Sequence, residues 1–367
     1  MGKIGKIDRN FAVTTGNTGH LRFYNVKNPP FGLYGLLAEP GTEPFCRIPV
    51  SLAQQVSEGV LGLCRNTAGG RVRFRTDSSS VAVKAVMPGK CLMPHMPFTG
   101  SSGFDLYVVD ESGYHYKGTF IPPVDRRKKF ISVIDLDDDR MKEVVIHFPL
   151  YDDVQSLHIG LEPDARLEAG GSYKLTDPVI FYGSSITQGG CASRPGNAYP
   201  NLISQKWNLD HRNLGFSGSA RGEQQMAQYI SHQKMSLFFM DYDHNSPVEE
   251  LKDRHEPFFL TIREQNPDLP IIIASRTMIP RTKQMEKDRD ERRKVIQQTY
   301  ENALKRADKQ VLFVDGIPVY GRAQSLGVSA DSCTVDGIHP TDLGFACMAE
   351  VFGEAIVKIL KISVEKG

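Results

Sequence analysis

The stretch that decides the fold of the second half of the chain is PVIFYGSSITQG, at residues 178–189. Its first part is a short apolar run between turn residues, which is typical of a buried strand in a parallel sheet. After Gly183 the stretch becomes a polar turn that contains Ser184 and Ser185. Open parallel sheets bind ligands at the carboxyl ends of their strands. We therefore expect a serine hydroxyl of this turn to face a cleft.

A second motif, DGIHP at residues 336–340, lies just before the last predicted helix. Its aspartate and histidine are close enough on one loop to hydrogen-bond, as the base and its orienting partner do in a hydrolytic triad. A serine hydroxyl needs a base to remove its proton, and an imidazole with an ordinary pKa of about 6.5 suits that role. We predict Ser185 as nucleophile, His339 as base and Asp336 as its orienting partner. The alternative for Asp336 is a cap on the last helix.

Two further segments supply candidate donors for an oxyanion hole. NLGFSG at residues 213–218 ends in Gly218, and glycine allows a backbone to approach a ligand closely. Asn245 follows a predicted strand end, next to His244, which is the main competitor for the role of base. A donor to the oxyanion is worth about 3–4 kcal/mol. We predict that the N–H groups of Ser185 and Gly218 and the side-chain amide of Asn245 supply the hole. The alternatives are a plain turn glycine and a helix N-cap.

Four segments resemble blocks one, two, three and five of the SGNH/GDSL esterases and acylhydrolases: residues 183–189, 213–218, 241–245 and 336–339. They occur in the family's order over residues 177–360. Ser184 stands where the family has an aspartate, and the third block lacks the Gly-x-Asn-Asp wording. The role of Asn245 therefore depends on its place in the order of blocks.

The resemblance implies a three-layer α/β/α, flavodoxin-like domain and a serine esterase that works through an acyl-enzyme. It further implies that the substrate is an acetyl or other short acyl ester, on a small molecule or a carbohydrate. Two other functions stay open. The same triad could transfer the acyl group to an acceptor other than water, or the chain could be a non-catalytic binding module of the same fold. The intact Ser185, Asp336 and His339 argue against the second.

The first half, residues 1–172, consists of short β-branched and aromatic runs separated by Gly, Pro, Ser and Asp, which predicts an all-β, jelly-roll-like sandwich. Arginine alternates with apolar residues over residues 71–75, as in a half-buried antiparallel strand. GFDLY at residues 103–107 resembles the Gly-x-Asp-Leu-Tyr signature of a β-domain that precedes SGNH domains. The single tryptophan, Trp207, lies outside this half, and sugar-binding surfaces usually have large aromatic faces. We therefore expect the β-domain to have a packing or substrate-rim role rather than to bind sugar independently.

The domains are predicted at residues 1–172 and 173–367, joined by a polar, glycine-containing linker over residues 167–177. From there strands and helices alternate, which predicts a parallel sheet with helices on both faces. Strands are expected at residues 179–182, 213–215, 237–240, 271–275 and 311–315, and helices near residues 198–207, 224–232, 248–265, 288–307 and 343–360. The almost wholly charged run at residues 285–294 is expected to be solvated helix surface or else a lid edge or subunit contact.

Composition excludes several classes of function. The 44 basic and 43 acidic residues leave a formal net charge of +1, so no overall field attracts nucleic acid or an anionic membrane. No apolar run approaches the ~18 residues of a membrane span. The six cysteines form no CxxC pair, and no dinucleotide or P-loop fingerprint occurs, so we predict no metal and no cofactor. The amino terminus has no apolar run of signal-peptide length, which favours a cytoplasmic chain, or a secreted or periplasmic one if a signal was trimmed. A homo-oligomer is compatible with the sequence.

Overall fold

The computed structural model describes residues 19–37, 44–125 and 127–362. The expectation of a cellular location rests on the amino-terminal residues, which lie outside these ranges. The chain packs into two compact units. Unit 1 comprises the residues up to Ile48, Arg65–Ser172 and Ser193–Gly196, and unit 2 comprises Pro49–Cys64, Tyr173–Ala192 and the residues from Asn197 onward. The units thus exchange two segments across the boundary predicted at residue 172, and the division into domains at residues 1–172 and 173–367 stays a prediction.

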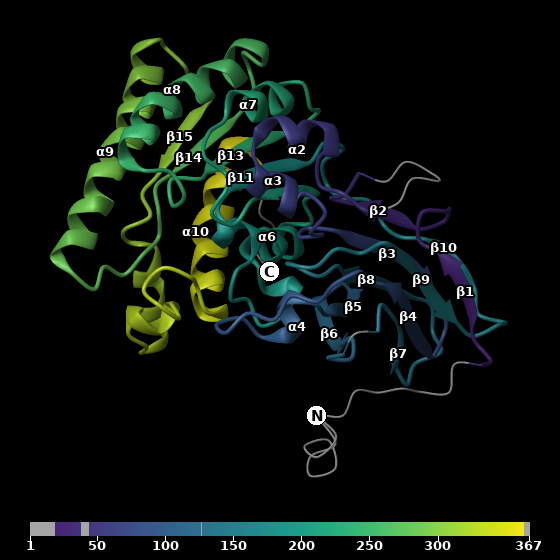
Figure 1. Ribbon diagram of the computed structural model, residues 1–367. Coiled ribbons are helices and arrows are strands. Elements are labelled where there is room, and N and C mark those ends of the chain that lie inside the picture. Colours follow the sequence, from purple (N-terminus) through teal and green to yellow (C-terminus); the bar gives the residue numbers. More distant parts are fainter. Residues whose placement is uncertain (1–18, 38–43, 126, 363–367) are drawn as a thin grey trace. The chain divides into compact units, whose positions relative to one another are not determined.

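Unit 1 is a sandwich of two antiparallel sheets, as predicted, and its labelled strands can be followed in Figure 1. In the described residues, one sheet has the order β1-β9-β4-β7: Arg22–Asn25, Ser156–Leu161, Ser80–Val86 and Lys129–Asp135. The other has the order β10-β3-β8-β5-β6, with β2 also paired to β3: Leu167–Ala169, Arg71–Thr76, Lys142–His147, Phe104–Asp110, Gly113–Phe120 and Gly32–Tyr34. Alternate residues such as Phe74, Val83 and Ile146 form one buried apolar cluster, as expected of facing sheets.

The expectation of a half-buried β3 is wrong. Arg71 and Arg73 are 1% and 5% exposed, so both faces of the strand are covered. A buried charge must be paired or hydrogen-bonded. Arg73 forms an ion pair with Glu143 of the neighbouring β8, and Arg71 Nη1 donates to the carbonyl oxygen of Gly69 at 2.6 Å. The arginines therefore reach their partners inside the fold rather than in solvent.

Several elements of the first half carry too little pattern to be predicted. They include β2, β6, β9 and β10, of which β10 occupies the start of the predicted linker and pairs with β3. The helices α2 (Val50–Val56) and α3 (Glu58–Leu63) belong to unit 2, where α2 contacts α7 (Gln224–Ser231).

Unit 2 contains a five-stranded parallel sheet in its described residues, with the order β12-β11-β13-β14-β15. These strands are His211–Gly215, Val179–Gly183, Leu237–Asp241, Ile271–Ala274 and Val311–Val314. The longer helices are α6 (Tyr199–Trp207), α7, α8 (Val248–Gln265), α9 (Lys283–Lys305) and α10 (Asp342–Leu360). The predicted alternation of strands and helices is confirmed. In the described part of the chain no helix is both long and apolar enough to cross a membrane.

The helices cover both faces of this sheet because neighbouring side chains of a strand point to opposite sides. Phe181 packs edge-to-face on Tyr199 of α6, with ring centroids 5.6 Å apart. The next residue, Tyr182, stacks at 4.9 Å on Phe258 of α8. The strand β11 is therefore buried along its whole length, and its carboxyl end, at Gly183, lies between β12 and β13.

Candidate active site

Ser185 begins α5 (Ser185–Gln188), a single helical turn that directly follows β11. The side chain of Ser184, which is buried, caps this turn by accepting from the N–H of Ile186 at 3.2 Å. Gly183 is required at the bend, because a Cβ there would collide with the side chain of Thr187 and the backbone of Asp241. The turn therefore presents Ser185 at the carboxyl edge of the sheet, while Ser184 has a structural task.

The structure brings Ser185, His339 and Asp336 together in unit 2. Ser185 Oγ lies 3.0 Å from His339 Nε2, and His339 Nδ1 lies 2.7 Å from Asp336 Oδ2. The other carboxylate oxygen, Asp336 Oδ1, accepts from the backbone N–H groups of Ile338 and His339 at 2.9 and 2.7 Å. This arrangement can move a proton from the serine hydroxyl to the imidazole while the carboxylate holds the ring.

The electrostatics of Asp336 favour its ionised form. Partial burial raises the pKa of this carboxyl, but the hydrogen bonds from the His339 ring and from the backbone of His339 and Ile338 outweigh burial and lower the pKa to about 2. A carboxylate that accepts several N–H bonds stays charged at low pH. It can therefore stabilise an imidazolium at neutral pH.

Gly218 presents a backbone donor that has no partner among the described residues. Its φ of +66° is in the left-handed region, and no atom lies within 4 Å of the position that a Cβ would take. In the described part of the chain its N–H donates to no acceptor. The neighbouring N–H groups of Ser219 and Ala220 are both used, donating to the carbonyl oxygen of Phe216 at 2.9 and 3.1 Å. The loop thus leaves one N–H available for a ligand.

Asn245 supports that same loop. Its Nδ2 donates to the carbonyl oxygens of Phe216 at 3.1 Å and Ala220 at 3.0 Å. The amide can donate to an oxyanion only after releasing one of these bonds. Asn245 does not cap the next helix, because the N-cap of α8 is Pro247 and no side chain caps it.

His244 lies beside Asn245 and forms no hydrogen bond with other described residues. Burial lowers its pKa far below the usual value, and the positive charges of Arg276, His339 and Arg292 lower it further. The imidazole of His244 is thus held neutral near that of His339. Of these two histidines, His339 is the one within hydrogen-bonding distance of Ser185.

A buried carboxyl, Asp241, contacts the serine turn, and the sequence did not predict it. Asp241, at the end of β13, is 2% exposed, and its Oδ2 accepts from Thr187 Oγ1 at 3.2 Å and from Tyr199 OH at 3.1 Å. Burial raises the pKa of Asp241 well above its ordinary value, and the nearby Asp243 adds to this. The available signal was an aspartate that ends an otherwise apolar strand.

The described residues contain no cluster of three or more histidines, cysteines or carboxylates arranged to hold a metal ion. All six cysteines are free thiols. Cys191 follows the serine turn, and burial together with the charge of Asp336 raises its pKa to about 11. A thiol in that state is a poor nucleophile at neutral pH. Cys191 is therefore a poor candidate for the nucleophile.

Two known family models match the chain. The model of the GDSL-like lipase/acylhydrolase family matches residues 176–357, and that of the GxDLY-type N-terminus of SGNH-hydrolase-type esterases matches residues 21–167. The chain therefore belongs to the GDSL-like lipase/acylhydrolase family of serine esterases. Among curated proteins, none matches the chain.

Solved structures resemble almost the whole chain. A candidate GDSL-like lipase from Bacteroides ovatus is 29% identical with a TM-score of 0.84, over 94% of this chain and 100% of its own. The salicylyl-acyltransferase SsfX3 of a tetracycline biosynthetic pathway is 21% identical with a TM-score of 0.76, over 94% and 99%. An acetyl xylan esterase from Butyrivibrio proteoclasticus is 12% identical with a TM-score of 0.55, over 93% and 99%. At their low identities, the last two show a shared fold alone.

Proposed function

We propose that this protein hydrolyses short acyl esters, with Ser185 as nucleophile, His339 as general base and Asp336 as its orienting partner. The observation that carries the proposal is the continuous chain of contacts from Ser185 Oγ through the His339 ring to the Asp336 carboxylate, at 3.0 and 2.7 Å. A nucleophile, a base and an orienting group at such distances are the parts that acyl transfer through a serine needs.

In the proposed first step, His339 Nε2 takes the proton of Ser185 Oγ as that oxygen attacks the ester carbonyl carbon. The negative charge that develops on the carbonyl oxygen is stabilised by the N–H groups of Ser185 and Gly218, and by Asn245 if its amide turns from Phe216 or Ala220. His339 then gives its proton to the departing alcohol, which leaves an acyl-enzyme. Water, deprotonated by His339, then attacks the acyl carbonyl carbon; the bond to Ser185 Oγ breaks, His339 returns the proton to that oxygen, and the acid leaves.

For the substrate we propose an acetyl or similarly short acyl group on a carbohydrate. The support is a fold shared with an acetyl xylan esterase. A second candidate is acyl transfer to an acceptor other than water, supported by the likeness of fold to a salicylyl-acyltransferase. Hydrolysis and acyl transfer would proceed through the same acyl-enzyme and differ in the nucleophile that attacks it, which is water or another acceptor.

The test is the release of p-nitrophenol from p-nitrophenyl acetate, with and without added sugar alcohols as acceptors. Ser185→Ala is expected to abolish release while the free energy of unfolding changes by less than about 1 kcal/mol. Ser184→Ala is the matched control. It removes a cap worth about 1 kcal/mol and is expected to keep most activity. If Ser184→Ala were inactive and Ser185→Ala active, the assignment of the nucleophile would be wrong. An acetylated acceptor among the products would favour the transferase.

A further inference from the structure

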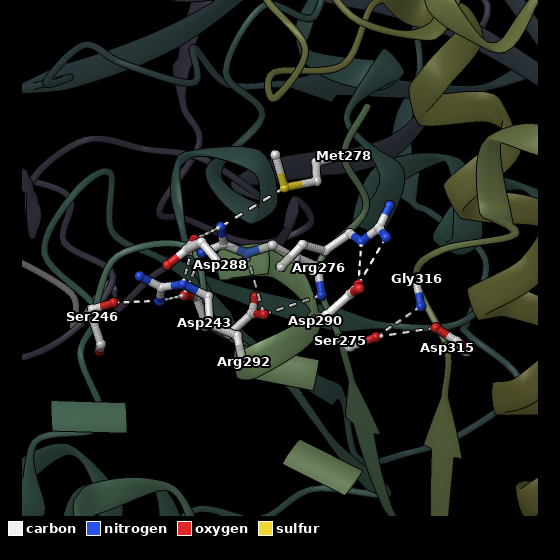
Figure 2. Close-up of polar contacts among 11 residues, drawn as sticks. Asp243, Ser246, Ser275, Arg276, Met278, Asp288, Asp290, Arg292, Asp315 and Gly316 are labelled. Carbon is white, nitrogen blue, oxygen red and sulfur yellow. Dashed lines mark hydrogen bonds and ion pairs between the residues drawn. The ribbon is translucent and has the colours of Figure 1, made fainter. Parts of the chain in front are cut away.

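Two buried arginines of unit 2 converge on one backbone carbonyl next to the candidate site. Arg276 lies just after β14 and Arg292 lies on α9, and they are 6% and 8% exposed. Nη2 of Arg276 and Nη1 of Arg292 both donate to the carbonyl oxygen of Asp243, at 2.8 and 2.7 Å. Figure 2 shows both guanidinium groups close to Asp243.

Arg292 also holds the chain beyond that point. The same Nη1 that binds the carbonyl of Asp243 donates to the carbonyl of Ser246. The two residues between these anchors are His244 and Asn245. The segment is therefore fixed on both sides by a single planar guanidinium group, whose fork of donors suits such bridging better than an ammonium group does.

The charges of the two arginines are balanced within the cluster. Asp288 Oδ2 accepts from Arg276 Nη1 at 3.1 Å and from Arg292 Nε at 2.8 Å. The carboxylate of Asp243 accepts from the backbone N–H of Arg276 at 3.2 Å and lies 3.4 Å from its Nε. Buried ion pairs of this kind add little stability compared with apolar packing. What the cluster holds in place is a better guide to its role.

The cluster is connected to the proposed oxyanion hole through Asn245. The two anchored carbonyls flank Asn245, whose amide holds the carbonyls of Phe216 and Ala220 on either side of Gly218. We propose that Arg276, Arg292 and Asp288 are positioning residues, which hold residues 243–246 so that Asn245 and Gly218 keep the geometry that the oxyanion needs. This inference rests on the proposed function for its catalytic consequence.

The proposal gives a role to part of the charged run at residues 285–294. Asp288 and Arg292 are one helical turn apart on α9, and they continue the buried stripe of Ile296 and Ala303 toward the site. Glu286, Lys287, Glu291 and Lys294 are exposed. The run is thus not uniformly solvated surface, because Asp288 and Arg292 on its inner face form an ionic clamp. A lid edge or subunit contact on its outer face stays a prediction.

The experiment compares Arg292→Lys and Asp288→Asn with Arg293→Gln as the matched control. Asp288 has a side chain 34% exposed, so its variant tests the clamp even if Arg292→Lys fails to fold. Arg293 lies on the same helix and forms an ion pair of 2.6 Å with Asp315, which the variant loses. In the described part of the chain, no hydrogen bond or ion pair joins Arg293 to residues 243–246. For each variant we would measure kcat and KM on p-nitrophenyl acetate, and amide hydrogen exchange of the peptide covering residues 242–248.

We expect both clamp variants to lower kcat by about 10- to 100-fold with KM within about 2-fold, because misplaced groups act in the transition state. Exchange of residues 242–248 is expected to be faster in the clamp variants than in Arg293→Gln, with residues 336–339 unchanged. If a clamp variant exchanged like the control, or exchanged faster without a loss of kcat, the inference would be overturned. A wild-type enzyme without Ser185-dependent hydrolysis would refute the proposed function instead. In that case the exchange data still test the clamp: clamp variants that exchange at the same rate as Arg293→Gln would overturn it as well.

Discussion

The environment of Asp336 has a direct consequence for the pH dependence of the free energy of unfolding. Both of its carboxylate oxygens accept hydrogen bonds within its own loop, and they hold its pKa at about 2 against an ordinary value of 3.8. Because the folded-state pKa is the lower one, the unfolded chain takes up this proton first as the pH falls. The resulting stabilisation is present above pH 3.8 and is lost as the pH falls through about 2.

The prediction concerns Asp336→Asn. At pH 6 the variant is expected to unfold more easily than the wild type by about 1–2 kcal/mol, a range reduced because the side chain is 29% exposed. The difference in free energy of unfolding should shrink as the pH is lowered from 5 to 2. Urea denaturation of both proteins at several pH values measures it. A difference that stays constant over this range would mean that the carboxylate is not the source.

Asn245 combines two tasks in our proposal, bracing the Gly218 loop and donating to the oxyanion. Asn245→Ala removes both, so kcat is expected to fall by about 10²–10³ with little change in KM. The loss of two hydrogen bonds to backbone carbonyls should lower the free energy of unfolding by about 1–3 kcal/mol. Steady-state kinetics and thermal denaturation of one variant separate the effects. Normal turnover with lowered stability would remove Asn245 from the site, and His244 would be tested next.

At the scale of elements, the turn that presents Ser185 depends on strands and helices around it. Thr187 on α5 and Tyr199 on α6 both donate to Asp241 at the end of β13. Burial raises the pKa of Asp241 well above its ordinary value, which favours the protonated carboxyl. The brace next to the nucleophile is thus expected to consist of hydrogen bonds between uncharged groups.

Asp241→Asn tests that interpretation. The folded wild type holds a proton that the unfolded chain releases above pH 3.8, so the stability contributed by this residue falls as the pH rises above that value. The amide of the variant does not titrate. Relative to the wild type, the variant is therefore expected to gain stability between pH 5 and pH 8. Thr187→Val is the comparison, because it should lose about 1–3 kcal/mol at both pH values. A variant that loses stability relative to the wild type on going to pH 8 would contradict a neutral Asp241.

The helix α9 is buried along part of its apolar side only. Ile296 and Ala303 are buried, but Leu304, which is also apolar, is 47% exposed. The helix ends at Lys305, one residue after Leu304. At the other end, charged residues take over the inward face.

At the scale of the whole molecule, the proposed reaction needs only groups that this chain supplies. The base is an imidazole, and the donors to the oxyanion are backbone and side-chain N–H groups. We therefore expect that dialysis against EDTA leaves kcat/KM on p-nitrophenyl acetate unchanged, with Ser185→Ala as the background control. Activity that disappears with the chelator and returns with zinc would overturn the mechanism.

The sequence by itself determined the local features of this protein. The apolar runs of β11 and β13 and the helical periodicities of unit 2 predicted elements within a few residues of their observed bounds. Ser185 and the pair of Asp336 and His339 stood out as candidates because each signal is contained in one turn or loop. In unit 1 the pattern was less complete. The buried Arg71 and Arg73 broke the rule that charge indicates an exposed face, because their partners come from segments distant in sequence or from backbone carbonyls.

Only the tertiary structure decided which of these groups meet. The distance of 3.0 Å between Ser185 and His339, the brace on Asp241 and the clamp of Arg276 and Arg292 all join residues that are remote along the chain or on different elements. Periodicity reports which face of an element is buried, but it does not report which element lies opposite. That choice follows from the strand order β12-β11-β13-β14-β15, which brings the loops after separate strands to one edge of the sheet.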